Sequence, residues 1–213
     1  MGTAQARLVL ATHNWHKVVE LRAILGPVMP GLHPEQVIGA SELRAPEPVE
    51  DGVTFAENAL IKARALAAST GLPAVADDSG LCVDVLGGAP GIFSARWSGR
   101  HGDDAANLTL LLAQLEDVAP EHRGAHFACA AALVTPDGFE HVETGMLRGR
   151  LAPSPRGEGG FGYDPVLIPD RQPARAEGRL LTCAELTAEE KNAISHRGEA
   201  FRALAPVVAS RLT

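Results

Sequence analysis

Short apolar runs alternate with amphipathic stretches along the first half of the chain. Short apolar runs bounded by polar residues predict buried strands, and apolar positions that recur at the helical period predict helices. Glycine and proline indicate where these elements end. In chain order, the pattern first predicts a strand over 7–11 and a helix over 17–25, which Gly26-Pro27 ends. A connection over 31–48 follows, with a possible strand at Val37-Ile38. The pattern then predicts a helix over 54–70, a strand over 73–76 that ends in Asp77-Asp78-Ser79-Gly80, and a strand over 81–86.

The helix over 54–70 carries the clearest local signals. Thr54 and Glu57 have the spacing of a capping box, in which the two side chains satisfy two backbone N–H groups at the helix start. Gly71 follows the last helical residue and favours a left-handed cap. Asn58 and Lys62 are four residues apart and share a face other than the apolar one, which consists of Ala59, Ala63, Leu66 and Ala67.

The second half of the chain adds a hairpin and further helices. Either Asp103 or Asp104 is a suitable cap for a helix with leucines at the helical period. Two strands over 127–134 and 140–148 are predicted to form a hairpin around a Pro136-Asp137-Gly138 turn. The last helical region opens with a Thr187–Glu190 capping box, breaks near 195–198 and kinks at Pro206. Strands and helices that alternate before a hairpin predict an α/β fold with a mixed sheet.

Composition narrows the class of protein. A length of 213 residues suits one domain, or two lobes around a shared sheet. The formal charge of −7 argues against a protein that coats DNA or RNA, but a mononucleotide needs only local positive groups. The three cysteines are far apart and odd in number, which predicts reduced thiols and a cytoplasmic protein. We see no signal peptide and no stretch long enough for a membrane span.

Two polar segments follow the predicted strands of the first half. Residues 12–17 (THNWHK) lie where a strand gives way to a helix, a place where backbone N–H groups bind anions. The alternative for this segment is a polar helix cap with a solvated lysine. Asp77 and Asp78 are adjacent, so their side chains should point to opposite faces of the sheet. A divalent cation would offset their charge, and the alternative is an acidic turn.

Two segments of the second half also carry candidate chemistry. Residues 159–165 (GGFGYDP) place an aromatic side chain between glycines, where it can stack on a base. The alternative is a glycine turn whose aromatic residues anchor a loop. Residues 191–198 (KNAISHRG) form a charged helix face unless the helix breaks at Ser195, which would bring His196 and Arg197 to a new first turn.

Together these segments resemble the Ham1/RdgB-like family, the inosine triphosphate pyrophosphatases that are also named dITP/XTP pyrophosphatases. The matching segments are in the family's order and cover the chain nearly end to end: LATHNWHK at 10–17, EDGVTFAENALIKA at 50–63, ADDSGLCVDVLGGAPGIFSARWSG at 76–99, GGFGYDP at 159–165 and ELTAEEKNAISHRG at 185–198.

The resemblance implies one domain over residues 1–213 with a long mixed sheet flanked by helices and a cleft between two lobes. It also implies a homodimer that hydrolyses ITP, dITP and XTP to the monophosphate and pyrophosphate with Mg²⁺, and so cleanses the nucleotide pool. A pyrophosphatase that prefers modified pyrimidines and a non-catalytic nucleotide-sensing module are the alternatives. The charged residues Asp77, Asp78, Lys17 and Lys62 argue against a sensing module.

The family's functional residues map onto this sequence segment by segment. The resemblance makes Asp78 the acid/base residue and a metal ligand, and makes Glu50 the second metal ligand. His13 stands where the family often has glycine, and Val49 precedes Glu50 where some relatives have a second acid. The residues assigned to substrate binding are Thr12, His13, Asn14, Trp15, His16, Lys17, Lys62, Ser79, Phe161, Gly162, Tyr163, Asp164, Lys191, His196 and Arg197.

Overall fold

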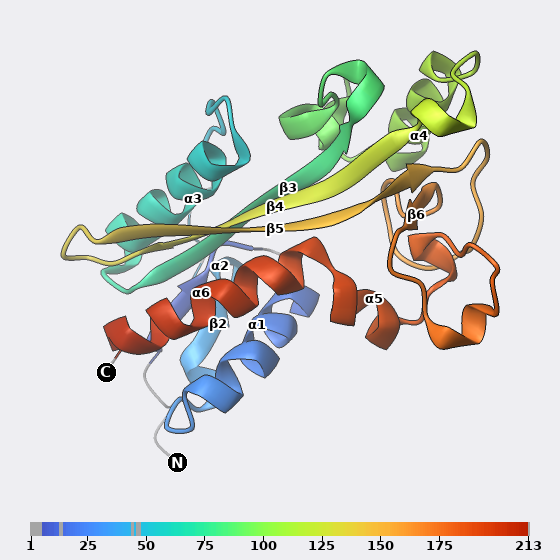
Figure 1. The fold of residues 1–213 in the computed structure, drawn as a ribbon. Coiled ribbons are helices and arrows are strands. Elements are labelled where there is room, and N and C mark those ends of the chain that lie inside the picture. Colours follow the sequence, from blue (N-terminus) through green and yellow to red (C-terminus); the bar gives the residue numbers. More distant parts are fainter. Residues whose placement is uncertain (1–5, 13–14, 44, 46–47, 213) are drawn as a thin grey trace. The chain divides into compact units, whose positions relative to one another are not determined.

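The computed structural model describes residues 6–12, 15–43, 45 and 48–212, without the side chains of 15–17. In this part of the chain, six strands form one sheet in the order β2-β1-β3-β4-β5-β6 (Figure 1). Strand β1 is parallel to β2 and β3, whereas β5 and β6 are antiparallel, which confirms the predicted mixed sheet. The strands are β1 (Leu8–Leu10), β2 (Val37–Gly39), β3 (Ala74–Val83), β4 (Gly124–Val134), β5 (Glu140–Leu151) and β6 (Leu167–Pro169).

Helices account for most of the remaining regular structure. The α-helices are α1 (Trp15–Val28), α2 (Ala40–Leu43), α3 (Phe55–Thr70), α4 (Asp104–Gln114), α5 (Ala188–Ile194) and α6 (His196–Leu212). The short 3-10 helices are η1 (Pro34–Gln36), η2 (Asp84–Leu86), η3 (Gly91–Arg96), η4 (Pro120–His122), η5 (Ala174–Ala176) and η6 (Cys183–Glu185). Over the residues described, no helix has the length and apolar character needed to cross a membrane.

The chain divides into two compact units. Unit 1 comprises Met1–Asp78, Cys129–Gly145 and Arg197–Thr213. Within it, alternate strand residues enter two separate clusters: Leu8 and Leu10 pack with α1 and α6, and Val9 packs with α3. This alternation follows from the strand period of two residues. Helices α1 and α6 therefore cover one face of this part of the sheet and α3 covers the other (Figure 1).

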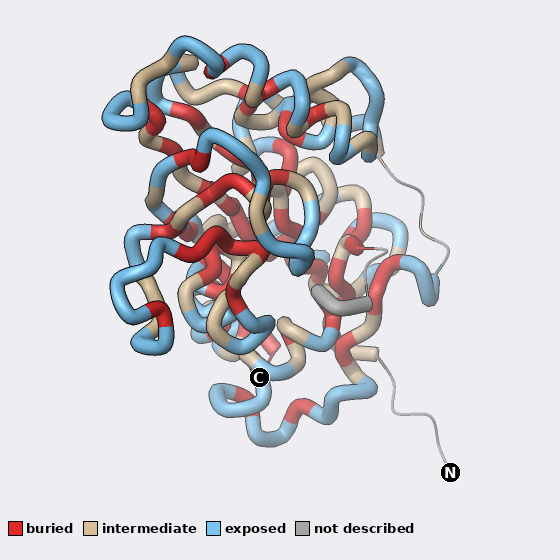
Figure 2. The backbone as a smooth tube through the Cα atoms, turned by 90° about the vertical axis from the view of Figure 1, so that its right-hand side faces the viewer, coloured by how far each residue is buried: buried red, intermediate tan, exposed pale blue. Residues whose placement is uncertain are grey.

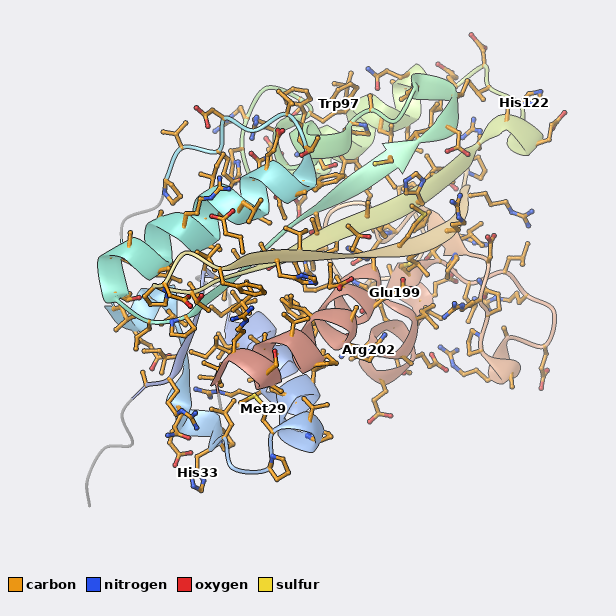
Figure 3. The ribbon with its side chains drawn as sticks, turned by 60° about the vertical axis from the view of Figure 1, so that its left-hand side comes forward. Met29, His33, Trp97, His122, Glu199 and Arg202 are labelled. Carbon is orange, nitrogen blue, oxygen red and sulfur yellow. The ribbon has the colours of Figure 1, made fainter. Side chains whose placement is uncertain are left out.

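Unit 2 comprises Ser79–Ala128 and Met146–His196. Its main apolar cluster joins Leu81 and Phe127 from the strands to Leu111 and Leu115 from α4, and includes Tyr163. Figure 2 shows buried residues along the inner stretches of the chain and exposed residues at many of the outer loops. In unit 1, Glu199 and Arg202 (labelled in Figure 3) are exposed on α6.

Helix α3 confirms the start and end signals of its sequence. The Thr54 hydroxyl accepts a hydrogen bond from Glu57 N at 3.1 Å, and Gly71 adopts a left-handed conformation with φ 66°. The capping box is not reciprocal, because the Glu57 carboxylate accepts from Val53 N at 2.6 Å instead of from the backbone of Thr54. Glu57 therefore orders the segment that precedes the helix.

Two element boundaries differ from the prediction. Helix α1 continues through Gly26-Pro27 to Val28, because a proline in the last turn removes only one helical hydrogen bond. The predicted strands over 73–76 and 81–86 are one strand, β3, which ends at Val83. Asp77 and Asp78 thus lie inside a strand and not at its end. The strand can contain both carboxylates because Asn58 on α3 and Arg197 on α6 donate hydrogen bonds to them.

In the second half of the chain the helix caps agree with the prediction, whereas β4 begins three residues earlier and β5 ends three residues later than predicted. Asp103 is the cap of α4, since its carboxylate accepts from Ala106 N at 3.1 Å. Thr187 and Glu190 form a reciprocal capping box at the start of α5. The helix breaks at Ser195, whose ψ of 142° is extended, before α6 begins at His196. All three cysteines are free thiols, as predicted.

Candidate active site

Asp78 is the centre of a polar cluster in unit 1. Its Oδ2 accepts a hydrogen bond from Asn58 Nδ2 at 3.1 Å, and its Oδ1 lies 3.4 Å from Lys62 Nζ. Asn58 and Lys62 are one turn apart on α3, so the shared face predicted for them is the face turned to Asp78. Helix α3 thus presents a neutral donor and a cation to one half-buried carboxylate.

Glu50 brings a second carboxylate to the same lysine. Lys62 Nζ lies 3.2 Å from Glu50 Oε1, so its ammonium group contacts both predicted metal ligands. The segment that carries Glu50 is held against α3 by a bond from Gly52 N to Asn58 Oδ1 at 3.0 Å. A side chain at Gly52 would overlap Asn58, so glycine permits this close approach.

The environment shifts the pKa values of Asp78 and Lys62. Burial raises the pKa of Asp78, and the charge of Lys62 and the hydrogen bond from Asn58 offset part of that rise. Burial alone would lower the pKa of Lys62, but the charges of Asp78, Glu50 and Asp77 outweigh it, so the pKa is raised. Lys62 therefore remains a fixed positive charge.

Asp77 points to the other face of the sheet, as the strand period predicts. Its Oδ2 accepts from Arg197 Nε at 3.0 Å at the start of α6. Both side chains are almost entirely buried, and the charge of Asp77 raises the pKa of Arg197 against the opposing effect of burial. Asp77 is thus committed to a buried ion pair, which leaves Asp78 as the acid with access to water.

The oxygen donors of Glu50 and Asp78 fit a magnesium ion. Magnesium is commonly bound by one or two carboxylates together with waters and substrate phosphates. Among the residues described, no group of three or more His, Cys, Asp or Glu side chains is arranged to hold a metal. Glu50 and Asp78 are thus the two carboxylates that would hold such an ion.

The predicted phosphate-binding segment lies where β1 gives way to α1. Thr12, which lies between the two elements in the sequence, is buried. His13 and Asn14 lie outside the described residues. Trp15, His16 and Lys17 form the first turn of α1, and their side chains also lie outside the description. The strand-to-helix junction is confirmed, whereas anion binding by these residues stays a prediction.

Unit 2 carries the predicted base-recognition segment, which we call the base loop and define as residues 160–164. The buried Asp164 carboxylate accepts from Phe161 N at 2.8 Å and contacts Lys191 Nζ at 2.5 Å. That ammonium lies 5.1 Å from the centre of the Phe161 ring, within the range of a cation–π contact. Phe161 is 61% exposed, so its ring is available to a planar ligand.

Tyr163 anchors the base loop to the interior of unit 2. Its side chain is buried, and its hydroxyl donates to the Ser94 carbonyl at 2.9 Å. The Ser94 hydroxyl in turn accepts from Leu81 N at 2.9 Å on strand β3, which also carries half-buried Ser79. Tyr163 therefore ties the loop to β3, as expected of an aromatic residue that anchors a glycine turn.

The break at Ser195 gives His196 and Arg197 different surroundings. The buried His196 ring stacks on Phe127 with 5.0 Å between ring centroids in unit 2. Arg197 pairs with Asp77 in unit 1. Binding of one ligand by both residues stays a prediction.

Asn58 is a site residue that sequence reasoning did not assign. Its backbone N–H donates to the Thr54 carbonyl at 3.1 Å, as in any first turn of a helix. Its side chain is almost fully buried and links the Gly52 segment to Asp78. The available signal was its four-residue spacing from Lys62 on a polar face of a helix with an otherwise apolar stripe. A buried asparagine needs partners for both ends of its amide, and the sequence alone does not identify them.

Comparisons with known proteins agree on one family. The model of the Ham1 family matches residues 8–207. The dITP/XTP pyrophosphatase of Streptomyces coelicolor is 68% identical over 203 residues, which cover 95% of this chain and 96% of that protein. The dITP/XTP pyrophosphatase of Leifsonia xyli is 55% identical over 202 residues, covering 95% of each chain.

Solved structures extend the similarity to the fold. The crystal structure of a nucleoside-triphosphatase, or dITP/XTP pyrophosphatase, from Mycobacterium abscessus has a TM-score of 0.74 at 49% identity. It covers 94% of this chain and 99% of its own. The structure of a HAM1 protein from Coxiella burnetii has a TM-score of 0.82 at 38% identity and covers 97% of this chain and 100% of its own.

Proposed function

This chain belongs to the Ham1 family, and from that premise we propose that it hydrolyses ITP, dITP and XTP to the nucleoside monophosphate and pyrophosphate. The observation that carries the proposal is the contact of Lys62 with both Asp78 and Glu50. Two carboxylates and a charged lysine in one half-buried cluster can hold a metal ion, activate water and offset charge on a phosphoanhydride.

In the proposed reaction, water attacks the α-phosphorus in line with a pyrophosphate leaving group. Asp78 orients and deprotonates that water, since its carboxylate is half-buried and held on both oxygens by α3. Lys62 and Lys17 supply positive charge to the phosphate chain without proton transfer. A magnesium ion held by Asp78 and Glu50, when bound, offsets the charge that develops on the phosphate oxygens.

We assign selectivity for the base to hydrogen-bond donors that bind the oxygen at the six-position of the purine. His196 and Arg197 are the donors proposed from the sequence, and Lys191 adds an ammonium group beside the exposed Phe161 ring. Adenine carries an amino donor at that position, so a donor would face a donor and the pairing would be lost. Guanine shares the oxygen, so exclusion of GTP requires recognition at its two-amino group.

The test is a pyrophosphate-release assay with ITP, dITP, XTP, GTP and ATP, each with and without Mg²⁺. We expect rapid pyrophosphate release from the first three nucleotides with the metal, slow release from ATP, and background rates in excess chelator. A modified-pyrimidine triphosphate in the same panel tests the alternative substrate class. Turnover of ATP as fast as ITP, or release of single phosphates, would contradict the proposal.

We also propose, from the resemblance, that the protein is a cytoplasmic homodimer. Light scattering after size-exclusion chromatography tests the oligomeric state, and a molecular mass near 22.3 kDa would show a monomer instead. Cell fractionation tests the location.

A further inference from the structure

Two adjacent aspartates at the start of α4 have different partners. Asp103 caps the helix through its bond from Ala106 N. Asp104 is therefore not needed for the cap, and its Oδ2 accepts from Gly162 N at 3.0 Å, 58 residues further along the chain. Gly162 is the central residue of the base loop. A side chain outside the segments assigned to substrate binding thus holds the loop that presents Phe161.

Helix α4 is a firm support for this contact. Asn107, one turn after Asp103, is buried and accepts from Ser98 N at 2.7 Å, and its amide donates to the Ala95 carbonyl at 3.2 Å. The Trp97 indole, labelled in Figure 3, donates to Gln114 Oε1 at 2.9 Å near the other end of α4. Both ends of α4 are therefore tied to the segment that contains η3, so the Asp104 backbone has a fixed position.

Several contacts hold the base loop, and the one from Asp104 comes from an exposed residue. Phe161 N is bound by buried Asp164, and the buried Tyr163 hydroxyl is bound to Ser94. The carboxylate of Asp104 lies on an exposed residue and accepts from Gly162 without entering the apolar cluster of unit 2. This contact can be removed without opening the core, whereas the contacts of Asp164 and Tyr163 are made by buried side chains.

We propose that Asp104 is a positioning residue that determines purine selectivity by fixing the base loop. The inference rests on the proposed function, because it needs the loop to bind the base. A carboxylate that accepts from a backbone N–H forms a charge-assisted bond, which is stronger than a neutral one. Loss of that bond removes a restraint on Gly162, between Phe161 and Tyr163, and lets the Phe161 ring shift relative to Lys191, which Asp164 holds in place.

The test compares Asp104→Ala, Asp104→Asn and the matched control Asp103→Ala by kcat/KM for ITP and for ATP. We expect Asp104→Ala to lower the ITP-to-ATP ratio about tenfold, through the ITP value, as loss of one hydrogen bond to a charged group predicts. Asp104→Asn keeps an acceptor oxygen and should retain most of the ratio. Asp103→Ala removes a helix cap, so it should lower Tm and leave the ratio unchanged.

A second readout needs no substrate. Hydrogen exchange of the Gly162 amide, followed by NMR, should be faster in Asp104→Ala than in the wild type and in Asp104→Asn. An unchanged ITP-to-ATP ratio in Asp104→Ala, unchanged exchange at Gly162, or an equal loss of ratio in Asp103→Ala would each overturn the inference.

The wild-type measurements separate this inference from the proposed function. A wild type that does not prefer ITP, or does not release pyrophosphate, refutes the function itself. A wild type that prefers ITP, with Asp104→Ala showing the same preference, refutes only the role of Asp104.

Discussion

Arg197 Nε donates to Asp77 Oδ2 at 3.0 Å, and the two side chains are 12% and 1% exposed. The pair joins the start of α6 to the middle of β3, within unit 1. Asp77 sits next to Asp78 in the sequence, yet this ion pair assigns it a different task. A charge in the interior of a strand is tolerated here because its partner is buried beside it.

Substitution of one member of this pair should destabilise the protein strongly. Asp77→Asn leaves the guanidinium of Arg197 buried without its counter-charge, and the expected loss in the free energy of unfolding is about 3–5 kcal/mol. Urea denaturation followed by circular dichroism measures this loss.

The control for this prediction is the ion pair of Arg64 with Glu140, whose side chains are 53% and 35% exposed. Solvent screens that pair, so Glu140→Gln should cost less than about 1 kcal/mol. Equal losses in the two variants would show that burial does not distinguish the pairs.

The sequence predicted the elements whose signals are local. Thr54 and Gly71 delimit α3, and Ser195 separates α5 from α6, because a cap or a break depends on residues within one turn. The continuous strand β3 was not predictable in this way. Its polar residues 77–80 resemble a turn, and they remain in the strand because Arg197, 120 residues away, and Asn58 provide partners.

The residues of the candidate site could be predicted from the sequence, whereas most of the contacts between them could not. The resemblance assigned Asp78, Glu50 and Lys62, and the structure brings these three together. The roles of Asn58 and Asp104 depend on which backbone N–H or carboxylate lies opposite each side chain. Such long-range contacts depend on how whole helices and strands pack together, and a local sequence pattern does not predict that packing.

Asp78→Asn should retain the fold and lose activity. Burial already raises the pKa of Asp78, so a neutral side chain of the same shape is tolerated there. Loss of a positioned base typically lowers the rate by about two orders of magnitude or more. Pyrophosphate release and thermal unfolding measure the two effects separately.

The matched control is Asp84→Asn, which makes the same change at an exposed carboxylate just after β3. It should leave both turnover and Tm near the wild-type values. An Asp78→Asn enzyme that turns over as fast as this control has no need of the proposed base.

Lys62→Met should have opposite effects on metal binding and turnover. The ammonium group contacts Glu50 and Asp78, and so competes with a cation for the same oxygens. Its removal should tighten Mg²⁺ binding to the nucleotide-free protein by at least about tenfold, given the Coulomb energy of such close charges. Turnover should fall, because a fixed charge for the phosphate chain is lost. Calorimetric titration measures the metal affinity.

Arg64→Met provides the comparison for Lys62→Met, since Arg64 lies on the same helix and pairs with Glu140 instead. Its metal affinity should match that of the wild type. Unchanged or weaker Mg²⁺ binding in Lys62→Met would show that the ion does not use these carboxylates.

Gly160→Ala tests how closely the base loop is built around Asp164. Gly160 and Gly162 both have positive φ, 74° and 59°, so alanine at either position costs about 1–2 kcal/mol in backbone strain. The positions differ in space: a side chain at Gly160 would overlap the Asp164 carboxylate, whereas one at Gly162 meets nothing. Gly160→Ala must therefore also displace the group that binds Phe161 N and Lys191. We expect both variants to have a lower Tm, and Gly160→Ala to raise KM for ITP about tenfold or more beyond the effect of Gly162→Ala, as loss of bonds to a charged group predicts. Equal KM values in the two variants would mean that Asp164 does not organise the base loop for binding.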